Sequence, residues 1–161
     1  MMNISKAIIL LIITSCLIYS CSSDKSTPIN NPNFIQFRMV EDSTDITAPF
    51  FKIEATGEMI QLEEKILLNL NDVKNAEIRR QEGRDNVDVL LNFTAEGTEK
   101  FSQITGDNIG KKLGIMVEDK LIMTPVIMAR IEVGKALVYY DIPENDAKQK
   151  VEFINEILKQ R

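Results

Sequence analysis

The sequence predicts an α+β domain, with a mainly antiparallel sheet and two helices packed on one face. In several short segments apolar residues alternate with polar ones, which is the pattern of strands with one buried face. Two polar turns, residues 82–85 and 118–120, each separate two such segments and indicate antiparallel hairpins. Residues 94–108 and 143–158 instead repeat apolar residues at helical spacing, so they are predicted as the two helices.

The first strand is predicted at residues 34–40, where Ile35, Phe37 and Met39 would form the apolar face and Gln36 would lie on the polar face. A polar loop would follow at residues 41–49. The next predictions are a short strand at 51–55 and a strand or mixed segment at 63–70. Five further strands are predicted at residues 76–81, 87–93, 113–117, 121–126 and 136–140. Within the fourth of these, Pro125 indicates a sheet edge or the end of pairing.

Both helices have recognisable start signals. The hydroxyl of Thr94 can accept a hydrogen bond from a first-turn amide, so Thr94 is predicted as the N-cap of a helix that ends near Gly110. Phe101 and Ile104 would face inward from this helix. Pro143 opens the second helix, followed by acidic residues that suit the helix dipole. Its apolar stripe is Ala147, Val151, Ile154 and Leu158.

The composition excludes several kinds of chemistry. The 161 residues contain no histidine, and both cysteines, Cys16 and Cys21, lie near the N-terminus. A histidine triad, a Cys/His zinc site and a disulfide framework are therefore excluded, and no catalytic residue or cofactor is predicted. The acidic run 41–45 lacks the glycine and closing glutamate of a calcium loop, so no metal site is predicted. The net charge of −5 gives no reason to expect a nucleic-acid partner.

The N-terminus has the layout of a secretory signal peptide. Lys6 precedes an apolar run at residues 7–19, which as a helix would be about 20 Å long. A single membrane span is the alternative, but the run is shorter than the roughly 30 Å hydrocarbon core. Ile18-Tyr19-Ser20-Cys21 resembles the lipobox of bacterial lipoproteins, in which the cysteine is acylated and becomes the new N-terminus.

Lipidation is therefore predicted at Cys21. The alternative, Cys16, also fits the motif but leaves an apolar run of only seven residues before Thr14. Ser22 after the cysteine weakly favours the outer membrane by resemblance to the known sorting pattern. The predicted organisation is a signal peptide at 1–20, the lipidated cysteine with a flexible tether at 21–33, and one domain at 34–161.

An ordered set of motifs carries a family resemblance. It comprises Phe37-Arg38-Met39-Val40, the segment 71–76, Phe93-Thr94-Ala95-Glu96-Gly97, Phe101, Thr105, Gly110, Leu113-Gly114-Ile115-Met116-Val117, Thr124-Pro125, Ile131 and Gly134. This set resembles the head subdomain of the first periplasmic domain of SecD/SecDF, the protein-export membrane subunits. The resemblance covers most of residues 34–158. It implies the fold and an ability to contact extended polypeptide, but not proton-coupled translocation, which depends on the membrane helices of that family.

The sequence departs from this family at three places. Glu118-Asp119-Lys120 stands where the family turn usually has Asp-Gly, and Thr124 stands where the family has Ser or Ala before the proline. The glycine that the family has in the last strand, near Tyr140 and Asp141, is missing.

The functional prediction is a non-catalytic binding module on an extracytoplasmic lipoprotein of the bacterial cell envelope. Its partners would be the membrane, through the N-terminal lipid, and an exported polypeptide or an envelope protein. Met39 and Met116 are expected in the core, whereas Met123 and Met128 flank Thr124-Pro125 and are predicted to contact the partner. One of Tyr139 and Tyr140 should be core and the other surface. The alternatives are an architectural envelope lipoprotein and a carboxylate-based enzyme.

Overall fold

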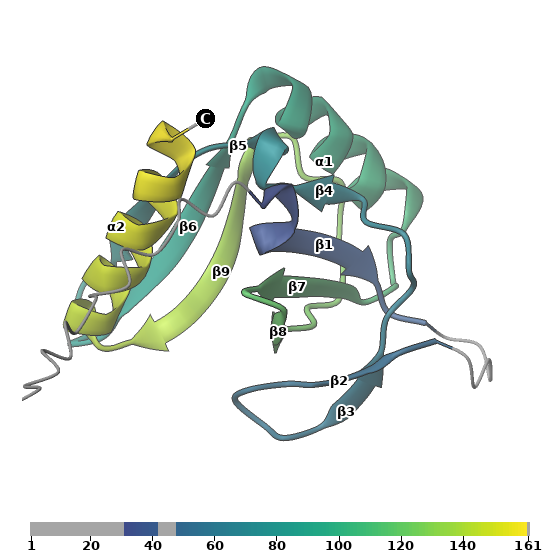
Figure 1. Cartoon of the computed structure of the whole chain (residues 1–161), viewed down its shortest axis with the longest axis horizontal. Helices are drawn as coiled ribbons and strands as arrows, with labels where there is room; N and C mark the ends of the chain where they lie inside the picture. The colour runs from purple at the N-terminus through teal and green to yellow at the C-terminus, as the bar shows by residue number, and fades with distance from the viewer. Residues whose placement is uncertain (1–30, 42–47, 161) are drawn as a thin grey trace, which may run out of the picture.

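The computed structural model describes residues 31–41 and 48–160 (Figure 1). The elements are η1 (Pro32–Phe34), β1 (Ile35–Met39), β2 (Phe50–Lys52), β3 (Met59–Gln61), β4 (Leu68–Asn69), η2 (Leu70–Asp72), β5 (Val73–Arg80), β6 (Val87–Phe93), α1 (Ala95–Asp107), β7 (Leu113–Val117), β8 (Lys120–Met123), β9 (Lys135–Ile142) and α2 (Glu144–Lys159). The predicted α+β class, with mainly antiparallel strands and two helices, is confirmed. Cys16, Cys21 and the predicted signal peptide lie outside the described residues.

The strands are divided among three sheets. The largest has the order β4-β1-β7-β8, a second has the order β5-β6-β9, and β2 pairs with β3 alone. All of these strand pairs are antiparallel. Figure 1 shows β9 running down and curving toward the start of α2, with β7 and β8 on the side opposite α2. As a result β8 and β9, each the last strand of its sheet, lie near one another.

An aromatic cluster joins the two larger sheets to α1. Phe37 on β1 packs edge-on against Phe93 on β6 and Phe101 on α1, with ring centroids 5.8 and 6.0 Å away. The rings of Phe93 and Phe101 are themselves 4.9 Å apart. Because all three side chains are buried, this cluster holds sheet, sheet and helix in one core.

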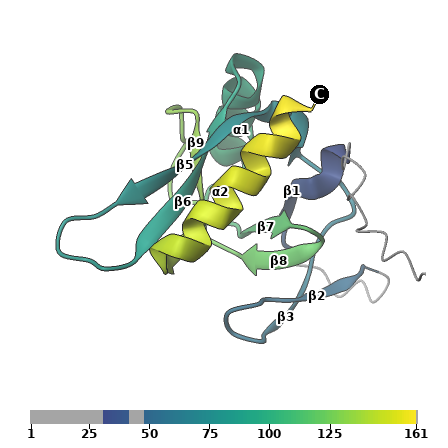
Figure 2. The same ribbon diagram turned by 60° about the vertical axis from the view of Figure 1, so that its left-hand side comes forward.

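Both helices begin as predicted. Thr94 caps α1, since its Oγ1 accepts a hydrogen bond of 3.0 Å from the backbone N–H of Gly97. On α2, Ala147 and Ile154 are fully buried, and Ile157, which was not in the predicted stripe, is buried beside them. Figure 2 shows α2 lying across β5 and β6 of the three-stranded sheet. No helix among the described residues is both long enough and apolar enough to span a bilayer.

Several strand predictions needed correction. The segment 63–70 contributes only the two-residue strand β4 before η2, and β3 was not predicted. β5 begins at Val73, earlier than expected, and β8 ends at Met123, before Pro125. Gln36 was predicted on the polar face of β1, yet it is only 3% exposed.

The burial of Gln36 has a clear physical reason. η1 and the β7–β8 turn surround its side chain and also supply hydrogen-bond partners, so the amide is satisfied inside the protein. Its Nε2 donates to the backbone oxygen of Asn33 at 2.7 Å and to Oδ1 of Asp119 at 3.3 Å, and its Oε1 accepts from Nε of Arg38 at 2.8 Å. The amide therefore ties η1 to the β7–β8 turn.

Two of the three family departures, at the β7–β8 turn and on β9, fall at positions with left-handed backbone. Glu118 and Asp119, the two residues of the β7–β8 turn, have φ values of 52° and 60°. A two-residue hairpin with two positive φ angles is the type for which Asp-Gly or Asn-Gly is preferred. Asp141 on β9 has a φ of 54°. Each of these two departures thus places a residue with a Cβ where glycine would adopt the backbone at lower cost.

Candidate binding site

The two methionines predicted to contact a partner line the same cavity. It has a volume of about 420 Å³ and an almost wholly apolar lining. We call it the methionine cleft and define it by Phe101, Leu113, Met123, Val126, Met128 and Ile131. Met128 is 81% exposed at its mouth, whereas Met123 is half-buried against the core. Met39 and Met116 are buried, as predicted.

A short backbone ladder holds one wall of the methionine cleft. The N–H of Gly110 donates to the oxygen of Ile127 at 2.8 Å, and the N–H of Ile127 donates back to Lys111 at 2.8 Å. The N–H of Leu113 then donates to the oxygen of Pro125 at 2.9 Å. Proline has no N–H to extend β8, but its carbonyl can still accept, so the segment after Pro125 continues beside the chain that leaves α1. The cleft wall is therefore fixed by hydrogen bonds within a segment predicted only as a strand end.

A second cavity lies between the outer strands of the two larger sheets. It measures about 580 Å³ and is lined by β8, β9, the turn that follows β2 and one residue of α2. Most of its lining is apolar, but Glu54, Glu58 and Lys150 also line it. We call it the strand-edge groove and define it by Ile53, Ile122, Met123, Tyr139, Tyr140 and Ile142. The start of β8 is already covered, since the N–H of Glu54 donates to the oxygen of Leu121 at 3.0 Å. The rest of the groove runs along the ends of two different sheets.

Met123 belongs to both cavities, so the methionine cleft and the strand-edge groove are adjacent. It is the last residue of β8 and pairs with Ile115. An unbranched thioether adapts to differently shaped neighbours more easily than a branched side chain does. Met123 is therefore the side chain that the two cavities share.

The two tyrosines differ as predicted. Tyr139 packs against the core and Tyr140 is exposed. Nζ of Lys150 lies 4.4 Å from the ring centroid of Tyr139, within range of a cation–π contact. Burial raises the pKa of Tyr139, and the nearby Glu118 and Glu54 raise it further, so this hydroxyl stays protonated. Tyr140 instead accepts a hydrogen bond of 2.7 Å from Nη1 of Arg84.

A buried carboxylate lies outside both cavities. Asp88 on β6 is 1% exposed and accepts hydrogen bonds from Arg79, Gln81 and the backbone of Asp141, at distances from 2.6 to 3.1 Å. Burial pushes the pKa of Asp88 upward, but the bond from the Asp141 N–H and those from Arg79 and Gln81 outweigh it and hold this pKa below its ordinary value. These donors make Asp88 a stable anion that links β6 to β5 and β9.

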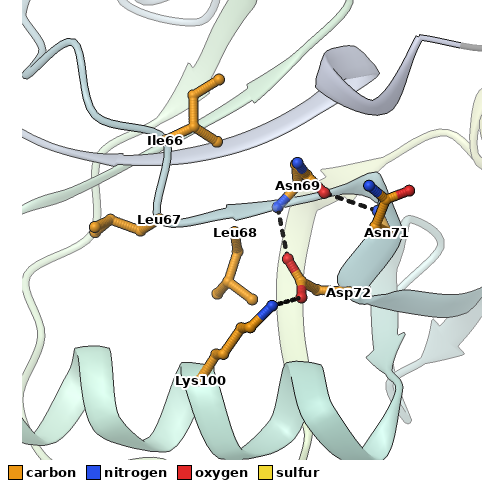
Figure 3. A pocket seen from close by; sticks show the side chains of 7 residues that line it. All are labelled: Ile66, Leu67, Leu68, Asn69, Asn71, Asp72 and Lys100. Atoms are coloured by element: carbon orange, nitrogen blue, oxygen red, sulfur yellow. Dashed lines mark hydrogen bonds and ion pairs between the residues drawn. The ribbon is translucent and has the colours of Figure 1, made fainter.

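A smaller pocket surrounds a second carboxylate, Asp72 (Figure 3). Its Oδ2 accepts from the backbone N–H of Asn69 at 3.0 Å, and its Oδ1 accepts from Nζ of Lys100 at 2.8 Å. The side-chain oxygen of Asn69 in turn accepts a hydrogen bond from the backbone N–H of Asn71, so polar groups of this pocket hydrogen-bond with one another. The arrangement fixes η2 on α1.

The carboxylates with shifted pKa values do not converge on either cavity. The pKa of Glu77 is lowered chiefly by a hydrogen bond from Lys135, and that of Glu144 is lowered to about 2 chiefly by one from Arg80. Neither residue, nor Asp88, lines the methionine cleft or the strand-edge groove. Across residues 31–41 and 48–160, no group of three or more metal-binding side chains is assembled.

Sequence reasoning named Met123 and Met128, which line one cavity, but did not predict the strand-edge groove. Ile53, Ile122 and Ile142 come from three separate segments, and the sheet arrangement that brings them together depends on the bend in β9. The Tyr139-Tyr140 pair was the one available signal for this groove. The exposed Val126, beside Pro125, was a comparable signal for the methionine cleft.

Comparisons with known proteins agree with this fold. The family model described as SecDF, P1 head subdomain, matches residues 46–149. The SecD translocase subunit of Elusimicrobium minutum is 34% identical over 70 residues, covering 44% of this chain and 15% of that protein. The SecD of Leptotrichia buccalis is 30% identical over 112 residues, covering 63% of this chain and 27% of that protein.

Solved structures show the same fold. A crystal structure of SecDF in a super-membrane-facing form superposes with a TM-score of 0.62 at 24% identity, covering 74% of this chain and 18% of that chain. A second SecDF structure, titled as that of a membrane component that enhances protein export, has a TM-score of 0.59 at 22% identity and covers 74% of this chain and 60% of that chain. The chain spans less than a third of the length of the two SecD relatives. It belongs to the SecDF P1 head subdomain family.

Proposed function

We propose that this protein is a non-catalytic binding module of the bacterial cell envelope that holds extended polypeptide outside the cytoplasm. The observation that carries the proposal is the pair of apolar cavities joined at Met123, with Met128 exposed at the mouth of one. Membership of the SecDF P1 head subdomain family supports a role in protein export. The relatives are named as protein translocase subunits.

The two cavities suit an extended chain better than a folded partner. Successive side chains of an extended strand point to opposite sides, so alternate apolar residues can enter a cleft and the groove beside it. Met123 and Met128 can adjust to side chains of different shape. A module of this kind binds many sequences, which is what contact with exported polypeptides requires.

The binding surface can be tested with Met128→Gln combined with Val126→Gln. Both side chains are exposed, so the double variant should fold normally while losing apolar contact area. The matched control is Met59→Gln, an exposed methionine on β3 that lines neither cavity. We expect affinity for a fluorescent synthetic peptide with leucine at alternate positions to fall about tenfold in the double variant and to stay unchanged in the control.

A peptide that binds wild type and double variant equally would rule out the methionine cleft as the site. If the wild-type chain binds no such peptide and crosslinks in cells only to folded envelope proteins, the architectural alternative would replace this proposal.

We further propose that the protein is a lipoprotein, with a signal peptide at 1–20, a lipidated Cys21 and tether at 21–33, and the domain at 34–161. A tether of this length would keep the domain near the membrane. Cys21→Ser should abolish acyl labelling and release the protein or leave it unprocessed, while Cys16→Ser should change neither. Labelling that survives Cys21→Ser would move the site to Cys16, whereas a wild-type chain that takes up no acyl label would overturn lipidation.

A further inference from the structure

Three cations are neighbours, along the chain or by backbone pairing, of residues that line the methionine cleft, and we call their positions its rim. Lys111, Lys112 and Arg130 are exposed. Within residues 31–41 and 48–160, none of them takes part in an ion pair, although seven ion pairs form elsewhere. Unpaired cations beside an apolar cavity leave charge available to a ligand.

The backbone holds the two lysines next to the cleft. Lys112 forms a β-bridge with Val126, which lines the cleft, and Lys111 accepts the N–H of Ile127 through its backbone oxygen. Both lysines are therefore carried by the hydrogen-bonded cleft wall. Their side chains are exposed, and the backbone from which they extend is held by these bonds.

Arg130 is placed by α1. A Cβ built on Gly106 would lie 2.5–2.7 Å from the Arg130 guanidinium, so the guanidinium rests on the helix where glycine leaves room. The neighbours of Arg130 on both sides, Ala129 and Ile131, line the cleft. Arg130 therefore lies in the segment between β8 and β9, whereas the two lysines lie in the segment between α1 and β7.

The nearby acids do not cancel this charge by direct pairing. Asp107 lines a different pocket together with Lys65 and Lys100. Glu132 follows Arg130 by two positions and forms no ion pair among the described residues. Inside the cleft the charged lining residue is Lys135, whose Nζ already binds Glu77 at 2.8 Å.

We propose that the methionine cleft selects extended segments in which aliphatic residues are followed by Asp or Glu. This inference rests on the proposed function and specifies its ligand. Aliphatic side chains would fill the cleft beside Met123 and Met128, and the acidic residues would reach Lys111, Lys112 and Arg130 at the rim. Because the whole chain carries a net charge of −5, it would otherwise repel acidic ligands, so the rim gives this site a local preference opposite to the overall charge.

The test uses two synthetic peptides with the same alternating leucine core and blocked ends. One is flanked by glutamates and the other by lysines. At low salt the purified full chain should bind the glutamate-flanked peptide about tenfold more tightly, and the preference should shrink as salt is added, because exposed ion pairs are screened. The double variant K111E/K112E should lose the preference.

The matched control is K74E/K159E, which changes the net charge by the same amount at exposed lysines that are in no ion pair of the described residues and line neither cavity. It should keep most of the preference. Equal binding of both peptides, or equal loss in both double variants, would overturn the acidic selectivity while leaving the proposed function intact. If neither peptide binds, both proposals fail.

A last arm distinguishes peptide from lipid. The glutamate-flanked peptide is titrated against vesicles of phosphatidylcholine with one third phosphatidylglycerol. The proposal is wrong if the vesicles displace the peptide and if K111E/K112E no longer binds the vesicles but still binds the peptide. In that case the three cations bind anionic lipid. Retained peptide in the presence of vesicles supports it.

Discussion

The backbone N–H of Asp141 donates a hydrogen bond to Oδ1 of Asp88 at 3.0 Å. This bond compensates for an irregularity in the β6–β9 ladder. Val87 pairs with Ile142 and Val89 pairs with Tyr139, so three steps on β9 match two steps on β6. Asp141 lies in the resulting bulge with its positive φ, and the buried carboxylate gives its N–H an acceptor there. Asp88 is thus a structural part of the bend that shapes the strand-edge groove.

Asp88→Asn should destabilise the fold by about 2–3 kcal/mol, because the charge-assisted bonds from Arg79 and Gln81 weaken in a buried site. The free energy of unfolding in urea measures the change. Asp146→Asn, at an exposed position of α2, is the control and should change the stability much less. A similar loss in both variants would show that the buried network contributes little.

The contribution of Asp88 should also depend on pH. Its folded-state pKa lies below the ordinary value, so the stabilisation is complete above the unfolded-state pKa, about 4, and is lost as pH falls through the folded-state pKa. The stability difference between wild type and Asp88→Asn should be constant around neutral pH and shrink below about pH 4. Urea unfolding at a series of pH values tests this, and a difference that already shrinks near pH 6 would contradict the assignment.

Asp141→Gly should stabilise the protein by about 0.5–1 kcal/mol, because glycine adopts the positive φ without a Cβ penalty. The backbone bond to Asp88 is retained. Asp141→Ala should have the opposite effect, since alanine adopts this conformation less readily than aspartate. Thermal unfolding of the three proteins gives the order. A destabilised glycine variant would mean that the Asp141 side chain makes a contribution larger than the backbone strain.

Two glycines of α1 should respond differently to alanine. A Cβ on Gly97 would overlap the backbone oxygen of Asp72, which cannot move without displacing η2. Gly97→Ala is therefore expected to cost about 1–3 kcal/mol despite the better helix propensity of alanine. Gly106→Ala meets only the Arg130 side chain and should stay within about 1 kcal/mol of wild type. Urea unfolding of both variants measures the contrast, and equal effects would argue against close contact between η2 and α1.

Local signals predicted much of the fold. Thr94, Pro143 and the stripe from Ala147 to Leu158 act through neighbours within one or two turns, so spacing alone located both helices. The β5–β6 and β7–β8 hairpins were likewise visible from their turns. β3 was missed because its pairing with β2 bridges a turn whose polar residues resemble a loop, and Met59 on it is exposed.

The arrangement of the candidate site was harder to predict. Alternation placed Gln36 on a polar face, but η1 and the β7–β8 turn surround its side chain there, and Asp119 in that turn is 83 positions away along the chain. Asp88 alternates with apolar neighbours as a solvent-facing residue would, yet donors from Arg79, Gln81 and Asp141 enclose it. The chemistry of methionine was enough to name Met123 and Met128 from the sequence. The cavity that they share is formed by α1, β7, the end of β8 with the chain after it, and the start of β9, and no local pattern shows that these segments meet.

The two register shifts between β6 and β9 also make it harder for a second copy of the protein to add a strand to this sheet. An unpaired strand at the end of a sheet is a template on which a second copy can add, and repeated addition leads to aggregates. The register between β6 and β9 shifts between Val87 and Val89 and again between Val89 and Leu90, so β9 offers no long, flat run of evenly spaced donors and acceptors. A short ligand segment needs only a few of these groups, whereas fibril growth needs an uninterrupted row. The bend that opens the strand-edge groove therefore also works against runaway self-association.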